Sequence, residues 1–429
     1  MGIPAKFARL IVGVIIILCG AAPAAGQYVP GPYEIEEEFD KEYGMDLVQL
    51  SYDRDWERIW ETHDRGFRVS MGSLNVRQYY ADQEVKFAAD FTDWLRFLYR
   101  YDRYEGLHPL WEERQRNDFE LELRPWRWFK VGVRTEPTFW KRYADIGATG
   151  KFHYGPGKYV DFGYTAIDFD NNYSFRHSNY DEGYEEIYGR APKRYEVAAS
   201  WALPAGFRVA GEGFYRTPST KYHTFFYGQE PDRARRYAEK AAEFSLHKEL
   251  PGHVELFYEG ETNRWEETRR LVSPPVGTVR LEQDYDGRLS LERHGGGAYF
   301  QPPGRHRLRG GGHRRHQTRR FYFTYDPYQS YDYVKTEWVY YLMWQLRVWR
   351  GLHVETGYMG ERIDAERFDF VREYTDGWRW YENRMPIALE YKFSEKIAFK
   401  MSSGFDLDRR DWGQYLYYDK GYAFVIACF

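Results

Sequence analysis

Residues 338–361 read Trp-Val-Tyr-Tyr-Leu-Met-Trp-Gln-Leu-Arg-Val-Trp-Arg-Gly-Leu-His-Val-Glu-Thr-Gly-Tyr-Met-Gly-Glu, and their alternation decides the fold. In each arm, every second residue belongs to an apolar and aromatic set, and the residues between form a more polar set. A period of two is typical of a β-strand with two different faces. The Arg350-Gly351 pair between the arms predicts a tight turn that joins two antiparallel strands.

Each arm has about ten residues, which is the length that a tilted strand needs to cross a bilayer. A Lys or Arg that faces lipid at the midplane of a barrel costs about 2–4 kcal/mol. The polar face carries Arg347, His353, Glu355 and Glu361, so we expect it to face the inside of a barrel. The residues predicted to face lipid are Trp344, Leu346, Val354 and Tyr358.

Residues 1–26 have the pattern of a secretory signal peptide. Lys6 and Arg9 precede an apolar run of about ten residues, which is too short for an ordinary spanning helix. Small residues at 22–26 provide the cleavage site that such a peptide needs. We therefore expect an exported protein that begins near Gln27.

Residues 27–65 do not alternate well and include the acidic run 34–42. Trp56, Ile59 and Trp60 follow at helix-like spacing. This pattern predicts a short N-terminal periplasmic extension, which is either a solvated tail or a plug in the mouth of the barrel.

Composition narrows the class of protein. After signal-peptide cleavage Cys428 is the single cysteine, so no disulfide framework can form. The net charge is −4 for the whole chain and −6 without Lys6 and Arg9, so no strong basic field favours nucleic acid as a partner. A mean hydropathy of −0.76 with 20% aromatic residues fits a chain that crosses a membrane with alternating strands rather than with apolar helices.

From residue 66 to residue 429 the alternation repeats, with turns of two sizes between the runs. Eight short turns, near residues 91–93, 125–126, 155–157, 203–206, 250–253, 302–304, 350–351 and 393–395, join about 16 strands, and a first and a last strand make about 18. The region 278–318 leaves a count of 16 open, since Asp284-Tyr285-Asp286-Gly287 could form a further turn. Longer polar stretches, at 102–118, 168–193, 216–239, 263–277, 363–383 and 406–414, are predicted to be external loops. The predicted fold is all-β: a transmembrane antiparallel up-and-down β-barrel.

The C-terminus ends Ala-Phe-Val-Ile-Ala-Cys-Phe, with Phe429 last. Here the chain resembles Gram-negative outer-membrane β-barrel proteins of the porin-like class, whose last strand commonly ends in Phe. The resemblance implies a cell outer-membrane location, contact with outer-membrane lipid, and Phe429 as the signal read by the barrel-assembly machinery. Ala427 departs from the usual aromatic residue, and Phe424 and Ile426 make the inner face of this strand unusually apolar.

The positions predicted to face the lumen carry both signs of charge. They either select solutes in a water-filled lumen or form cross-strand ion pairs that stiffen the wall, and the sequence leaves both readings open. The lumen-facing candidates are Arg96, Arg100, Glu120, Glu122, Arg124, Lys130, Arg134, Arg208, Glu212, Glu255, Glu259, Arg347, Glu355 and Glu390.

Residues 305–320 contain seven Arg, three His and no acid, and Gly310–Gly312 suggests a flexible basic loop. Such a loop is either solvated or recruits an anionic solute through its guanidinium groups. His313 and His316 lack an evident third metal ligand, so no metal site is predicted. The Arg residues assigned to the loop are Arg305, Arg307, Arg309, Arg314 and Arg315.

No Gly-x-Ser-x-Gly, His-Glu-x-x-His, Gly-rich phosphate loop or Cys-x-x-Cys-His motif occurs, so we expect neither an enzyme nor a cofactor. The first hypothesis is a porin-like channel that passes small hydrophilic or charged solutes through a mixed-charge lumen. The second is the barrel sheath of a porin–cytochrome complex that holds a multihaem cytochrome partner. The third is an exporter of a charged polysaccharide.

Overall fold

The structure is a computed structural model, and it describes residues 59–60, 63–74, 78–106, 114–137, 144–155, 157–169, 184–225, 233–271, 284–324, 328, 330–371, 373–407 and 418–429. No helix in this part of the chain is long and apolar enough to cross a membrane. The predicted signal peptide and residues 27–58 of the predicted extension lie outside the described residues.

The described strands form one antiparallel sheet. Its strands are β1 (Gly66–Leu74), β2 (Gln78–Thr92), β3 (Leu95–Gly106), β4 (Arg114–Trp126), β5 (Phe129–Glu136), β6 (Asp145–Gly155), β7 (Lys158–Ala166), β8 (Tyr184–Arg190), β9 (Lys193–Leu203), β10 (Phe207–Phe225), β11 (Arg233–Leu250), β12 (Val254–Leu271), β13 (Tyr285–Phe300), β14 (His306–Phe323), β15 (Tyr331–Trp349), β16 (Leu352–Asp369), β17 (Tyr374–Lys392), β18 (Ile397–Asp406) and β19 (Tyr418–Cys428).

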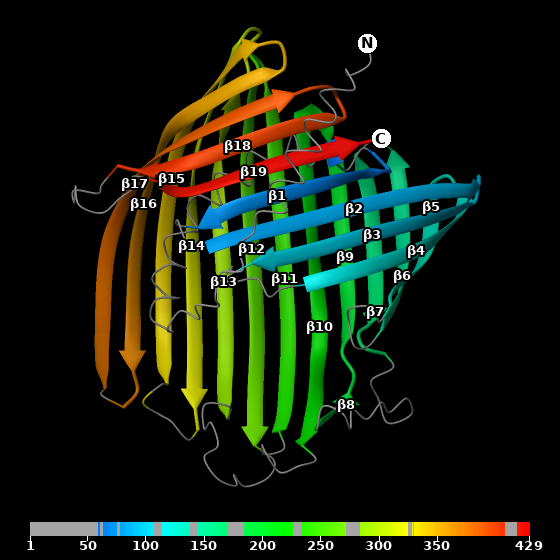
Figure 1. Cartoon of the computed structure of the whole chain (residues 1–429), viewed down its shortest axis with the longest axis vertical. Helices are drawn as coiled ribbons and strands as arrows, with labels where there is room; N and C mark the ends of the chain where they lie inside the picture. The colour runs from blue at the N-terminus through cyan, green and yellow to red at the C-terminus, as the bar shows by residue number, and fades with distance from the viewer. Residues whose placement is uncertain are drawn as a thin grey trace. The chain divides into compact units, whose positions relative to one another are not determined.

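The sheet closes on itself because β1 pairs with β19, from Gly66 opposite Cys428 to Leu74 opposite Lys420. β9 pairs with residues 207–216 of β10, and β8 pairs with residues 220–225 of the same strand. These two short strands therefore share one place in the wall, and the 19 strands occupy 18 places. The prediction of a closed barrel with about 18 strands is confirmed. In Figure 1, β1 to β4 cross in front of the long strands β10 to β14, as tilted strands on opposite walls of a barrel do.

The eight short turns lie at or within two residues of their predicted places, and they join the strands from β2–β3 to β17–β18. The predicted external loops are shorter than expected, because β10 to β17 continue through much of 216–239, 263–277 and 363–383. The further turn that the sequence left open at residues 284–287 does not form. Residues 285–287 belong to β13, and their backbones pair with β12 and β14.

Burial along β15 shows which face of the sheet is inside. Lys335 and Glu337 are 1% and 0% exposed, whereas Leu342 is 61% exposed. A sheet that buries charge and exposes leucine is inside-out relative to a soluble protein, as expected of a barrel wall in lipid. Trp344 and Tyr358 are exposed on the same outer face as Leu342, and Leu346 and Val354 lie there half-buried. The predicted lipid-facing side of this hairpin is confirmed.

The apolar outer surface ends before the long strands do. Further along these strands the outward side chains form cross-strand ion pairs, such as Arg264–Glu292 at 2.9 Å, Arg270–Asp286 at 2.6 Å and Arg320–Asp332 at 2.6 Å. Charged side chains on a lipid-facing wall are costly, so these parts of β12 to β15 extend beyond the lipid. We call this part of the barrel the extended wall.

Ile59 and Trp60 pack on the inner face of the seam between β1 and β19. They contact Ala398 and Ile426, which are fully buried. The ammonium nitrogen of Lys86 lies 4.3 Å from the centroid of the Trp60 ring and donates a hydrogen bond to the Trp60 carbonyl oxygen. This packing explains why the inner face of the last strand is apolar: it covers the end of the predicted N-terminal extension.

Candidate functional site

The interior of the barrel has two different sides. Along the middle of β14 to β18 the inward side chains are almost completely removed from solvent, and we call this the packed side. Along β4 to β11 many inward charged groups remain accessible, and we call this the open side; the Arg208 side chain, for example, is 53% exposed. The largest fully buried inward residues of the packed side are Lys335, Glu337, Val339, Met359, Glu361, Ile363, Arg384 and Lys400.

The packed side contains a buried ionic cluster. The Arg384 guanidinium donates to Glu361 Oε2 at 3.0 Å and also pairs with Glu382. The Lys335 ammonium lies 3.3 Å from Glu337 Oε2, and Arg315 lies 3.5 Å from the same oxygen. Buried charges need partners because desolvation penalises each of them, so this part of the wall acts as a structural element.

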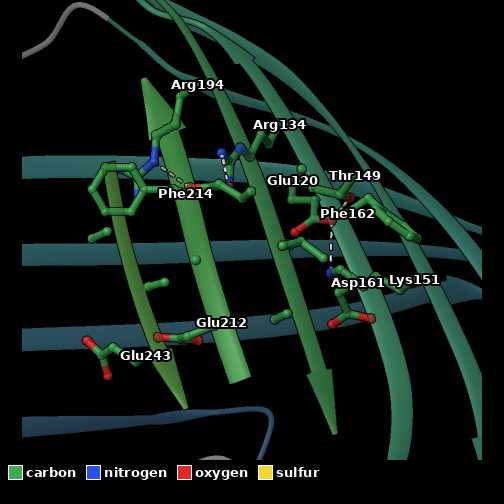
Figure 2. A pocket seen from close by; sticks show the side chains of 17 residues that line it. Glu120, Arg134, Thr149, Lys151, Asp161, Phe162, Arg194, Glu212, Phe214 and Glu243 are labelled. Carbon is green, nitrogen blue, oxygen red and sulfur yellow. Dashed lines mark hydrogen bonds and ion pairs between the residues drawn. The ribbon is translucent and has the colours of Figure 1, made fainter. Parts of the chain in front are cut away.

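The open side has a recess of about 400 Å³, which Figure 2 shows from close by. Strands β4 to β7 and β9 to β11 supply its walls. Its lining mixes charged groups with two aromatic rings and small apolar residues. The labelled residues in Figure 2 are Glu120, Arg134, Thr149, Lys151, Asp161, Phe162, Arg194, Glu212, Phe214 and Glu243.

The cationic groups of the recess are neutralised by neighbours on adjacent strands. Arg134 donates to Glu196 Oε2 at 2.6 Å, and Arg194 lies 2.8 Å from the other oxygen of that carboxylate. Lys151 donates to Glu120 Oε1 at 3.0 Å. These pairs align side chains along the wall, as cross-strand pairs do in sheets.

Two carboxylates of the recess are not neutralised. Glu212 and Glu243 are directly opposite each other on β10 and β11, and both are exposed to the interior. Among the described residues, neither forms an ion pair. The recess has five carboxylates and three cationic side chains, so its net charge is negative. The uncompensated negative charge is concentrated at Glu212 and Glu243.

The lumen-facing candidates on the first strands form a ladder of ion pairs. Arg100 pairs with Glu84 at 2.6 Å, and Arg96 pairs with Asp64, which precedes β1. Glu122 is buried, and it receives a hydrogen bond from Arg124 at 2.9 Å and lies 3.8 Å from Lys130. The structure therefore shows the cross-strand pairing that the sequence left as one of two readings; a role in solute selection stays a prediction.

The remaining candidates divide between the two sides. On the open side Arg208 donates to Glu255 at 3.1 Å, and Glu259 lies on the same face of β12 as Glu255. On the packed side Glu355 and Glu390 are buried, and Arg309 donates to Glu355 at 3.2 Å. Arg347 lies at the turn end of β15 and is exposed.

The predicted basic loop is wrong, because residues 306–323 form strand β14. Its backbone pairs with β13 and β15 along almost its whole length. The glycines allow close approach rather than flexibility, since a Cβ at Gly311 would lie 2.7 Å from the Gly296 carbonyl oxygen. Alternation then separates the Arg residues: Arg307, Arg309 and Arg315 point inward, Arg314 points outward, and Arg305 lies in the preceding turn.

The same alternation places His313 and His316 on opposite faces of β14. His313 is buried inside, and His316 shares a hydrogen bond with Thr336 at 3.0 Å on the outer face. Two side chains on opposite faces of a strand cannot bind one ion. Among the described residues, no group of three or more His, Cys, Asp or Glu side chains is arranged to hold a metal ion.

Sequence reasoning missed several residues of the recess, chiefly Lys151, Asp161, Arg194, Glu196 and Glu243. Arg194 and Glu196 alternate with the apolar, outward Tyr195 and Val197, so the alternation of β9 could have predicted that both charged residues face inward. Glu243 had no such signal, because β11 contains few apolar residues. The recess is recognised only when the pairing of β4 to β11 is known.

Comparison with known proteins gives similarity in structure only. No family model matches the sequence, and no curated protein matches it. OccK11 (OpdR) of Pseudomonas aeruginosa is 10% identical, with a TM-score of 0.40 over 86% of this chain and 96% of that one. OccAB3 of Acinetobacter baumannii is 11% identical, with a TM-score of 0.38 over 85% and 98%. OmpTdeltaL8, a loop L8 deletion mutant of OmpT, an outer membrane protein of Vibrio cholerae, is 10% identical, with a TM-score of 0.37 over 85% and 96%.

Proposed function

We propose that this barrel is an outer-membrane channel, rather than an enzyme, and that small hydrophilic solutes cross it along the open side. The observation that carries the proposal is the contrast between the two sides of the interior. The packed side buries its charges, whereas the recess exposes Glu212 and Glu243 to the interior. Accessible charge inside a closed membrane barrel supports a water-filled path.

The charges that line this path also determine whether cations or anions pass more easily. Arg134, Arg194 and Lys151 are neutralised by carboxylates, so the excess charge of the recess is negative. A permeating ion that passes within about one Debye length, about 8 Å at physiological salt, feels this charge. We therefore propose that the recess favours cations over anions of the same size.

Location and assembly belong to the same proposal. Phe429 lies at the seam of the barrel, where its amide nitrogen donates to the Arg65 carbonyl oxygen at 2.9 Å and its ring lies 6.2 Å from that of Phe67. A terminal aromatic residue at the closing strand supports a role for Phe429 in recognition by the barrel-assembly machinery.

Replacing both Glu212 and Glu243 by Gln tests the cation preference. We expect the ratio of cation to anion permeability to fall about twofold to fivefold, because a unit charge about 4 Å from an ion in water is worth about 1 kcal/mol. The measurement is the reversal potential of purified protein in a planar bilayer under a potassium chloride gradient.

The matched control is Glu266→Gln, which removes one exposed carboxylate from the outer face of β12. It should leave the reversal potential unchanged. A double variant that behaves like this control would refute the cation preference of the recess. Absence of conductance in every form of the protein would refute the channel, and would favour a sheath around a partner such as a multihaem cytochrome.

A further inference from the structure

The interior of the extended wall is lined with aromatic rings. Two rows of directly opposite residues run across β11 to β15, and residues opposite each other in antiparallel strands share a face. Both rows lie on the inner face. Tyr333 and Tyr331 precede the buried, inward Lys335 by two and four residues along β15, and residues at this spacing point to the same side of a strand. The rows are Tyr237, Glu267, Gly287, Phe321, Tyr331 and Glu239, Trp265, Leu289, Arg319, Tyr333.

The rings form a continuous strip along these strands. Tyr237 and Trp265 have ring centroids 6.5 Å apart, Trp265 and Phe321 are 6.0 Å apart, and Phe321 and Tyr331 are 5.6 Å apart. Gly287 makes room for this strip, because a Cβ there would lie 3.0 Å from the Phe321 ring. We call the strip of these four rings, with Tyr285, Phe323 and Tyr333 beside it, the aromatic collar.

Guanidinium groups lie over the rings of the collar. Arg216 is 4.7 Å from the centroid of Tyr237, and Arg269 is 5.2 Å from that of Tyr285. Among the described residues Arg216 forms no ion pair with a carboxylate. On the inner face of β10 to β15 at the collar, five cationic residues whose side chains are described (Arg216, Lys221, Arg235, Arg269, Arg319) face two acidic ones (Glu239, Glu267).

The two carboxylates sit directly beside the rings. Tyr237 donates its hydroxyl hydrogen bond to Glu239 at 2.9 Å, and Tyr285 donates to Glu267 at 2.9 Å. Glu267 also accepts from Arg235 through both of its oxygens and from Arg269 at 2.6 Å, so its acceptor positions are filled. A carboxylate has about four acceptor positions, so Glu239 can still accept from a hydroxyl group of a solute. The collar therefore offers flat ring faces, guanidinium donors and a carboxylate acceptor within one surface.

We propose that the aromatic collar binds acidic sugars, as single rings or short oligosaccharides, at the end of the channel that the extended wall surrounds. The flat C–H face of a sugar ring packs on the negative face of an aromatic ring. Its carboxylate pairs with a guanidinium, and one of its hydroxyls donates to Glu239. This proposal rests on the proposed channel, because the collar would capture solutes at one end of it. The cation preference proposed above belongs to the recess, whereas the collar carries an excess of cationic side chains.

The same chemistry fits nucleic acid less well. Single-stranded nucleic acid also uses aromatic stacking and cationic groups, but its phosphates need a strongly basic groove. Two carboxylates lie inside the collar, and the chain as a whole has a net charge of −4. Both features repel a long nucleic acid, with its many phosphates, more strongly than a short acidic oligosaccharide, which carries only a few charges in total.

The test measures binding of trigalacturonic acid to the purified full chain in detergent by isothermal titration calorimetry. Maltotriose serves as the uncharged ligand and oligothymidylate as the nucleic-acid ligand. We expect trigalacturonic acid to bind more tightly than maltotriose and far more tightly than oligothymidylate. Equal or tighter binding of oligothymidylate would overturn the assignment to sugars, and so would absence of trigalacturonic acid binding.

Two variants locate the binding on the collar. Phe321→Leu removes a central ring and should weaken trigalacturonic acid binding about threefold to tenfold. Arg216→Gln removes a guanidinium and should weaken it about tenfold or more, with little effect on maltotriose. The control is Tyr322→Leu, which changes the next residue of β14 on the outer face and should leave binding unchanged.

Heat-modifiable migration on gels shows whether each variant has formed the barrel. Equal affinities for Phe321→Leu, Arg216→Gln and Tyr322→Leu, all folded, would overturn the collar as the binding surface. Calorimetry needs no conductance, so the two proposals fail separately. Binding without conductance would contradict the channel alone, and conductance without binding would contradict the collar alone.

Discussion

Arg384→Met is expected to destabilise the barrel by about 3–5 kcal/mol, because it leaves buried carboxylates without their partner. Arg384 and Glu361 are almost completely buried, and the guanidinium also pairs with Glu382. The free energy of unfolding in urea, measured for protein refolded into lipid vesicles, reports the loss. The additional change Glu361→Gln should restore part of the stability, because the variant then buries one uncompensated charge fewer.

The control is Arg379→Met, which lies on the same strand as Arg384 but on its outer face. Its guanidinium side chain is 58% exposed and pairs with Asp364 outside the barrel. Exposed pairs contribute at most about 1 kcal/mol, so this variant should stay close to wild type. Equal losses in the two variants would show that the packed side is not dry.

Leu342→Arg is expected to cost about 2–4 kcal/mol in lipid vesicles. Leu342 lies on the outer face of β15 between Tyr340 and Trp344, and it is the most exposed of the three. An arginine there would have to face hydrocarbon. Urea unfolding in vesicles measures the cost, and the same variant in detergent should lose less because the micelle adapts around the charge.

Val334→Arg on the same strand tests where the lipid ends. Val334 lies on the outer face of the extended wall, directly opposite Glu366 of β16. A cation there meets a carboxylate in water, so the change should stay within about 0.5 kcal/mol of wild type. A loss as large as that of Leu342→Arg would mean that the extended wall lies within the lipid.

Alternation was a strong guide to the wall of this barrel. The hairpin of β15 and β16 carries large apolar residues on one face and charged residues on the other. Charged residues are costly in lipid, so the orientation of the hairpin follows from the residues alone. Six of the eight short turns contain Gly or Pro, which interrupt the alternation at the ends of the strands. Strand number then follows from counting turns.

The predictions failed where the outer face leaves the lipid. In β14, and in the part of β12 that belongs to the extended wall, both faces carry charged residues. The composition of such a strand is the same as that of a solvated loop, so the sequence does not distinguish them. Residues 238–242 of β11 read Ala-Glu-Lys-Ala-Ala and lack a clear apolar face. Pairing with neighbouring strands, rather than local preference, holds these segments in extended form.

The site was predictable only in part. Alternation placed individual charges such as Glu212 and Arg134 on the inner face, but not beside one another. Glu212 meets Glu243 because β10 and β11 pair in one register, and a shift of one residue would turn Glu243 outward. Burial of the packed side also depends on contacts between distant strands and the residues near Trp60, which no local pattern contains.

The central claim is that water fills the open side of the barrel and continues across the membrane. The direct test uses Glu212→Cys in a background in which Cys19 and Cys428 are both replaced by Ser, so that one thiol remains in the chain. A membrane-impermeant cationic thiosulfonate is added while the current through single molecules is recorded in a planar bilayer. Leu342→Cys, which faces lipid, is the matched control.

We expect a stepwise fall in current for Glu212→Cys, because each modification adds a bulky cation to the cysteine in the recess. The current through Leu342→Cys should not change. A Glu212→Cys protein that is labelled without any change in current would contradict the account, and so would a folded barrel that never conducts.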